Sequence, residues 1–270
     1  MAPINDFGVM AARPLFEPVS AWLRGFGGDV PPGLTALNAA LTALDSPPQA
    51  ASGLPIRFAP PEDDGMGYEA RVFARGEVAT RPGNWHDFFN ALAWLAYPRT
   101  KCILNGRHHA ALQAQHAAGR GERGVERDAI TQFDECGIVV VSASPELIAL
   151  LRAHEWKALF WQHRAHIARE MRFLVFGHAT WDQLRAPFVG LTAKAVLLEV
   201  EGDWLAWSPA QQRADIDRRL AELFLQAAAY ARPRDFQPLP LLGLPGATPE
   251  NANAAYYDDT RQFRPRRKPG

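Results

Sequence analysis

The 270-residue chain has little cysteine, no net charge and no long apolar segment. Its two cysteines, Cys102 and Cys136, are far apart in sequence and make no disulfide framework, which fits a reducing compartment. The 29 basic and 29 acidic residues cancel, so bulk electrostatics gives no reason to expect binding to nucleic acid or to a membrane surface. No stretch approaches the roughly 20 apolar residues of a membrane span, and the first residues lack a signal-peptide pattern. We therefore expect a cytoplasmic protein without a membrane partner, and nucleic acid is disfavoured.

Signatures of nucleotide and cofactor chemistry are also missing. The chain has no Gly-x-Gly-x-x-Gly after an expected strand, no P-loop, no Gly-x-Ser-x-Gly and no Cys-x-x-Cys. These absences disfavour nucleotide-cofactor redox chemistry, P-loop hydrolysis and a zinc ribbon. The cofactor stays open at this point, and a divalent metal is compatible with the sequence. With 47% hydrophobic residues, the chain has ordinary globular composition.

Helical patterns dominate the chain, and strand patterns are few. We expect an α+β fold: a predominantly helical single domain spanning 1–270, with a small, mostly antiparallel sheet. The Pro/Gly-rich residues 232–270 should wrap the body in extended form, with the last eight or so frayed. Helices are expected at 14–46 in two segments, 84–115 with a break at Pro98, 144–184 with breaks, and 208–230; strands are expected at 56–60, 68–81, 129–143 as a hairpin turning at 134–137, and 191–202.

Residues 84–109 hold the richest set of polar candidates. His86 and Asn90 are four residues apart and share one helix face. Lys101, Asn105 and His109 form a polar stripe at spacings of four and four on the next helix. Two such stripes that meet across a cleft would bring donors, acceptors and titratable groups together. The alternative is a buried hydrogen-bond network that only ties the two helices to each other.

Two further groups combine histidine and carboxylates. His178 and Asp182 are four apart on an expected helix, where such a pair can orient a general base, ligate a metal or form an ordinary ion pair. In the expected hairpin, Asp128 points to one face, and adjacent Asp134 and Glu135 are candidates for acid/base or metal-ligand roles. Turn formation is the competing explanation for Asp134, because Asp favours turn positions.

Two other patterns are interpreted as surface features. His163, His166 and Glu170 resemble a ligand stripe, but they lie on one amphipathic helix, and three groups on one helix rarely complete a metal shell. We expect them to form a solvated face. The basic residues of the segment 261–268 suit an acidic partner or nucleic acid, although a frayed tail is the commoner explanation.

Several segments together resemble a bacterial family, found mainly in proteobacteria, that is catalogued as domain of unknown function 3025. The resemblance runs from 14–23 to 256–265, and its hallmark segments are NWHDFFNALAWLAYPRTKCILN (84–105), RDAITQFDECGIVV (127–140), FGHATWDQL (176–184), GLTAKAVLLEV (190–200) and PLPLLGLPG (238–246). The family has no established activity to carry over. The resemblance implies hallmark status for His86, Asp87, Asn90, Lys101, Asn105, Asp128, Asp134, Glu135 and His178. The chain departs from the family at Asp182, where a glutamate is usual.

The sequence leads to an enzyme hypothesis with a non-catalytic alternative. In the first, His86, His178, Asp134 and Glu135 act as acid/base groups or metal ligands, and a hydrolase is the most economical chemistry. Asn90, Lys101, Asn105, His109 and Asp128 would bind a small-molecule or anionic substrate. In the second, the same polar residues hold the fold of a binding or interaction protein. A distance above about 10 Å between His86 and His178 would exclude a joint role. The oligomeric state is left open.

Overall fold

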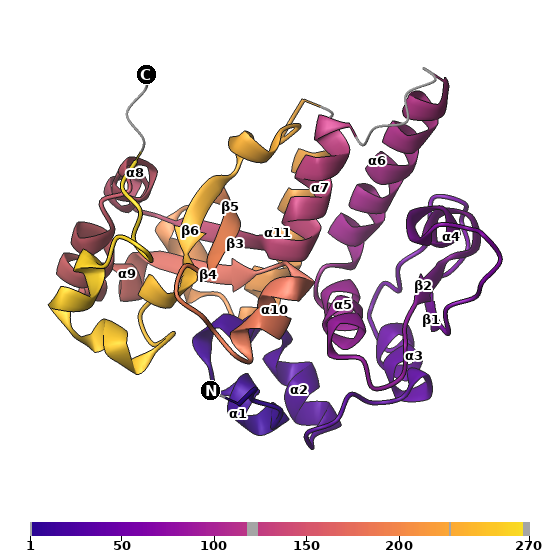
Figure 1. The fold of residues 1–270 in the computed structure, drawn as a ribbon, viewed down its shortest axis with the longest axis horizontal. Helices are drawn as coiled ribbons and strands as arrows, with labels where there is room; N and C mark the ends of the chain where they lie inside the picture. The colour runs from indigo at the N-terminus through magenta and orange to yellow at the C-terminus, as the bar shows by residue number, and fades with distance from the viewer. Residues whose placement is uncertain (1, 118–123, 227, 267–270) are drawn as a thin grey trace.

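A four-stranded mixed sheet forms the centre of the structure, a computed structural model that describes residues 2–117, 124–226 and 228–266 (Figure 1). The strand order is β4-β3-β5-β6. Strand β3 pairs antiparallel with β4 and parallel with β5, and β5 pairs antiparallel with β6. The bounds are β3 Gly137–Ser142, β4 Met171–Val175, β5 Thr192–Glu199 and β6 Gln237–Pro240. All six residues of β3 are buried, as expected for a central strand.

Helices surround this sheet and separate it from a second, smaller one. The helices are α1 Phe7–Ala11, α2 Ser20–Phe26, α3 Leu34–Thr42, α4 Tyr68–Arg75, α5 Trp85–Ala96, α6 Pro98–Ala117, α7 Val125–Cys136, α8 Pro145–Ala153, α9 Arg164–Glu170, α10 His178–Leu184 and α11 Pro209–Leu225. The small parallel pair of β1 (Arg57–Ala59) and β2 (Glu77–Ala79) lies with α3 and α4 beyond α5 and α6 (Figure 1). No helix within the described ranges is long and apolar enough to pass through a bilayer.

The α+β expectation is confirmed, but three local predictions are wrong. Residues 68–75 form helix α4 rather than a strand: Tyr68 and Val72 are one helical turn apart, and Gly76, with φ of 68°, ends the helix in a left-handed conformation. Residues 125–136 form helix α7 rather than the first arm of a hairpin. Ala129, Ile130 and Phe133 are its buried residues, a spacing typical of a helix. Strand β4 also interrupts the segment predicted as helical up to residue 184.

The C-terminal segment packs against the body as short turns more than as extended chain. After β6, 3-10 turns occupy Leu241–Gly243, Pro249–Ala252 and Ala254–Asp258. Phe263 is buried, and the carbonyl of Arg264 accepts a 2.7 Å hydrogen bond from the indole of Trp156. The expected fraying therefore does not include these two residues, and residues 267–270 lie outside the described part of the chain.

Helix α6, which carries several site candidates, is anchored at its start by a carboxylate from α11. Asp217 accepts hydrogen bonds from the backbone amides of Arg99 at 3.0 Å and Thr100 at 2.8 Å, and from the Thr100 hydroxyl at 2.7 Å. Free amides at a helix start need such acceptors. Asp217 thus fixes the position from which α6 runs along the cleft described below.

We predict that Asp217→Ala lowers the free energy of unfolding by about 2–4 kcal/mol, because it leaves buried amides without an acceptor. Urea unfolding of the purified protein measures the change. Asp258→Ala is the matched control: Asp258 is exposed and forms an ion pair with Lys157 at 2.8 Å, so its loss should cost less than about 1 kcal/mol. Equal effects of the two substitutions would contradict the anchoring role.

Candidate functional site

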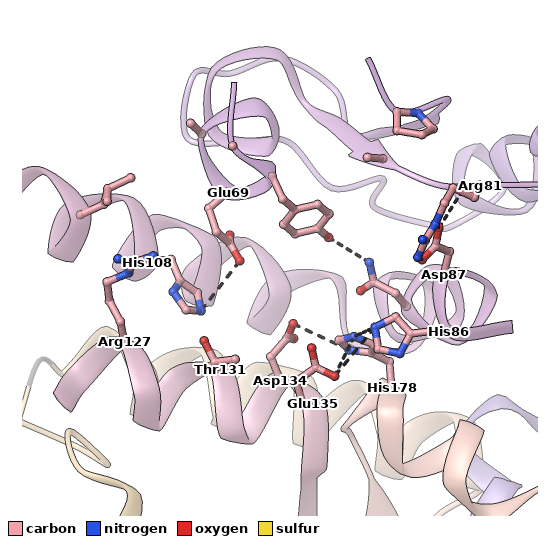
Figure 2. A pocket seen from close by; sticks show the side chains of 17 residues that line it. Glu69, Arg81, His86, Asp87, His108, Arg127, Thr131, Asp134, Glu135 and His178 are labelled. Atoms are coloured by element: carbon pink, nitrogen blue, oxygen red, sulfur yellow. Dashed lines mark hydrogen bonds and ion pairs between the residues drawn. The ribbon is translucent and has the colours of Figure 1, made fainter. Parts of the chain in front are cut away.

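Three helix ends meet at one cluster of two histidines and a glutamate (Figure 2). His86 lies in the first turn of α5, Glu135 in the last turn of α7, and His178 is the first residue of α10. The Nε2 atoms of His86 and His178 are 3.2 Å apart. The Oε2 atom of Glu135 lies 3.4 Å from Nε2 of His178 and 3.9 Å from Nε2 of His86. One atom from each residue therefore forms a compact triangle.

The start of α5 is held by a network that orients its first turn. The side chain of Asn84 caps the helix by accepting from the amide of Asp87 at 3.0 Å. The carboxylate of Asp87 accepts from the amide, Nε and Nη2 of Arg81 at 2.8–2.9 Å. Burial alone would raise the pKa of Asp87, but these bonds outweigh it and the pKa is lowered. The residues on either side of His86 in this turn are thus held by hydrogen bonds that do not involve its ring.

The start of α10 approaches the end of α7 so closely that only glycine fits at position 177. A Cβ on Gly177 would overlap the carbonyl oxygen of Glu135 and the amide nitrogens of Cys136 and Gly137. The amide of Gly177 instead donates to the carbonyl of Gly137 at 2.8 Å. This backbone contact sets the distance between Glu135 and His178.

The environment of His178 favours a neutral imidazole. Burial is the main cause that lowers its pKa to about 3, against an opposing effect of the negative charge on Asp134. Among the described residues, the Nδ1 atom of His178 is buried without a hydrogen-bond partner, and Oδ2 of Asp134 lies 3.8 Å from it. A shift of about 1 Å would convert this contact into a hydrogen bond. Carboxylates in this position behind a ring commonly orient metal-binding histidines.

A buried ion pair joins Asp134 to the helices on the other side of the cluster. Nζ of Lys101, whose side chain is only 4% exposed, donates to Oδ1 of Asp134 at 2.5 Å and to Oδ1 of Asn90 at 3.0 Å. Nδ2 of Asn90 donates to the hydroxyl of Tyr68 at 2.9 Å. Burial disfavours both charges, yet their attraction prevails: the pKa of Lys101 is raised and that of Asp134 is lowered. The two residues form a charged pair.

The cluster opens into a cleft of about 720 Å³ between α4 and β2 on one wall and α7 on the other (Figure 2). The α7 wall presents Arg127, Thr131, Asp134 and Glu135, which are spaced to share one helix face. Glu69 and His108 lie toward the Arg127 end, away from the histidine pair (Figure 2). The cleft therefore has a histidine–carboxylate cluster at one end and a second group of titratable side chains at the other.

Glu69 is the carboxyl of this second group, and its pKa is strongly raised. Its Oε2 accepts from Nδ2 of Asn105 at 2.6 Å, and its Oε1 lies 3.9 Å from Nε2 of His108. Burial raises the pKa of Glu69 to about 7, although the bond from Asn105 opposes the shift. A carboxyl that titrates near neutral pH in a cleft is a candidate acid/base group.

A family model described as "Protein of unknown function (DUF3025)" matches residues 56–267. The chain belongs to this family. Every residue that lines the cleft lies within the matched range, so the cleft is formed entirely by the family's part of the chain. No match was found among curated proteins or among solved structures.

The structure brings the four residues predicted as catalytic into one place and separates the five predicted to bind substrate. His86, His178, Asp134 and Glu135 all line the cleft. Asn90 lines it too, whereas Lys101 and Asn105 lie behind the wall, bonded to Asp134 and Glu69.

Three candidates from the sequence point elsewhere. His109 stacks on Phe73 with ring centroids 3.7 Å apart, because eight residues of helix turn it about 80° away from Lys101. Asp128 is not among the lining residues of the cleft, unlike Arg127 one position earlier. Asp182 pairs with Arg185 at 2.7 Å rather than with His178.

Sequence reasoning missed the residues at the other end of the cleft. Glu69 lies in a segment predicted as a strand, Arg127 just before the predicted hairpin and Thr131 within its first arm. A helical reading of α6 does contain a usable signal: Lys101, Asn105 and His108, at i, i+4 and i+7, share one face. That spacing finds His108 in place of His109.

We predict that Gly177→Ala lowers the free energy of unfolding by about 1–3 kcal/mol, because the added methyl group forces α10 away from the end of α7. The control is Gly106→Ala in α6, where an added Cβ meets nothing within 4 Å and helix propensity improves. Urea unfolding of both variants measures the difference. A Gly177→Ala protein as stable as the control would contradict the close approach.

We predict that Glu69→Gln becomes more stable relative to the wild type as pH rises. The pKa of Glu69 is raised in the folded state from 4.5 to about 7, so the wild type has its full stability below pH 4.5 and loses part of it as pH rises through 7. The loss corresponds to roughly 3 kcal/mol. The charges that face Glu69 include those of Asp134, Lys101 and Arg127, and all remain in the variant. Urea unfolding at pH 4.5 and 8 measures the difference, and parallel pH curves would contradict it.

Proposed function

We propose that the protein is a metal-dependent hydrolase whose divalent metal is held by His86, Glu135 and His178. The carrying observation is the triangle of donor atoms, with sides of 3.2, 3.4 and 3.9 Å. Tetrahedral coordination with bonds of about 2.0–2.1 Å requires donor atoms about 3.3 Å apart. The three atoms therefore need only small movements to share one ion.

The composition of the site also supports this chemistry. Two imidazoles and one carboxylate, with a further position facing a cleft, are a common catalytic set for zinc. Such an ion acts as a Lewis acid towards water and towards a carbonyl or phosphoryl group. The same donor set also binds Fe²⁺ in oxygenases, so both metals belong in the test.

The surrounding residues have separate roles in this proposal. Asp134 orients the ring of His178 from behind, and Lys101 holds Asp134 in place. Asn90, which lines the cleft and is bonded to Lys101, is a positioning residue of the same kind. Glu69 is suited to exchange a proton with a substrate that extends along the cleft. Arg127 on the α7 wall favours a substrate that carries negative charge, whereas the charge of Arg81 is already offset by Asp87.

A non-catalytic role is the second candidate, and one observation favours it. A separation of 3.2 Å between the His86 and His178 nitrogens is also a good hydrogen bond when one ring carries the proton. The polar cluster would then serve to tie α5, α7 and α10 together. Metal binding separates the two candidates.

We predict that the wild type binds Zn²⁺ or Fe²⁺ at this site and that His86→Ala, His178→Ala and Glu135→Gln each weaken the binding. Because changes behind a ligand already cost about 10–100-fold, loss of a ligand should cost more than about 100-fold in affinity. Isothermal titration of tag-free, metal-stripped protein with each metal salt measures this. A second assay measures hydrolysis of p-nitrophenyl acetate, p-nitrophenyl phosphate and a panel of amides, with and without added metal. The hydrolysis rate of each ligand variant should fall in parallel with its metal affinity.

His109→Ala is the matched control, since this histidine stacks on Phe73 outside the cleft and should leave affinity and rate unchanged. The titrations use a His163→Ala/His166→Ala background, which removes the other histidine cluster of the described residues. If that protein binds neither metal, the metallohydrolase proposal fails and the structural role of the cluster stands.

A further inference from the structure

Glu146, His163 and His166 form a second group of possible metal ligands in the described part of the chain. One donor atom from each lies within 4.8 Å of the others, and Oε1 of Glu146 is 4.0 Å from Nε2 of His163. The two imidazole rings have centroids 6.0 Å apart. The side chains are accessible, with 31% exposure for His163 and 62% for Glu146.

Local structure on both sides brings these donors together. Glu146 lies in the first turn of α8, whose start is set by Ser144 as the cap and Pro145 in the first position. His163 follows a π-helical turn, Ala158–Gln162, in which the amide of His163 donates to the carbonyl of Ala158 at 2.9 Å. Such turns insert an extra residue and occur frequently at functional sites. His166 then follows in α9.

The structure removes the objection that the sequence raised. The stripe of His163, His166 and Glu170 places all donors on one helix, which rarely completes a metal shell. In the structure the third donor is Glu146, from the separate helix α8. Glu170 ends α9, where its carbonyl accepts hydrogen bonds from Ala143 and Ser142.

This group is remote from the cleft. Glu135 precedes strand β3 and Glu146 follows it, so the six residues of β3 separate the two groups by about 20 Å. In Figure 1 the helices α8 and α9 lie on one side of the sheet and α5 on the other. The two groups therefore cannot share an ion or form a two-metal centre.

We propose that Glu146, His163 and His166 bind a divalent transition metal as a second, independent site. Two imidazoles and a carboxylate suit Zn²⁺, Ni²⁺ or Cu²⁺, and water completes the shell at this accessible position. A bound ion would cross-link α8 to α9 next to the end of the sheet. The site stabilises the fold and takes no part in the chemistry of the cleft.

The test uses the tag-free full chain with His86→Ala/His178→Ala, so that its result does not depend on the cleft. Titration with Zn²⁺ should give one equivalent per chain, and Zn²⁺ should raise the melting temperature. Adding His163→Ala/His166→Ala should abolish both effects, and Glu146→Gln should weaken binding at least several-fold. Glu170→Gln, on the same helix but outside the group, is the matched control and should change neither.

Electron paramagnetic resonance of the Cu²⁺ form should show two coordinating imidazoles, one of which His163→Ala removes. Three results would overturn the proposal. The first is that the His86→Ala/His178→Ala protein binds no equivalent of Zn²⁺. The second is that binding survives the loss of both His163 and His166. The third is that Glu170→Gln weakens binding as much as Glu146→Gln does.

Discussion

The arrangement of the cleft depends on the buried ion pair between Lys101 of α6 and Asp134 of α7. A charge in this environment is stable only with its partner, because an unpaired buried charge costs several kcal/mol. The pair fixes more than two helices. Asp134 adjoins Glu135 in the chain and faces His178, and Asn90, which also accepts from Lys101, is one turn from His86. One ammonium group thus holds two residues, Asp134 and Asn90, that adjoin the members of the histidine–glutamate cluster.

The cluster itself forms where helices begin and end. Side chains in the first turn of α5, the first position of α10 and the last turn of α7 converge because the backbone at Gly177 lies directly against the end of α7. The chain's zero net charge conceals this arrangement, since charges that cancel over the whole molecule are still concentrated along one cleft. Neutral composition excludes bulk electrostatic attraction and leaves local recognition open.

Residue identity was easier to predict than residue geometry. His86, His178, Asp134 and Glu135 were selected from the sequence, and they do meet, although Asp134 and Glu135 were assigned to a hairpin turn and lie in a helix. The short apolar run of β3 follows α7 without a break. The predicted strand was therefore extended too far towards the N-terminus, into residues that form α7. Conversely, Glu69 escaped notice because the alternating pattern of its segment suggested a strand.

The sequence by itself determined the class of the fold, the long helices α5, α6 and α11 and the residue types available for chemistry, because these follow from composition, hydrophobic period and capping residues that act locally. Only the tertiary structure decided which polar groups meet. His86 and His178 are separated by 92 positions, and Glu146 joins His163 across a turn and a helix. Such pairings depend on how helices pack and where close backbone contacts are tolerated, and no local pattern encodes them. The choice of His108 over His109, by contrast, follows from local helix geometry: at about 100° per residue, seven residues bring His108 to within about 20° of the direction of Lys101, whereas eight turn His109 about 80° away.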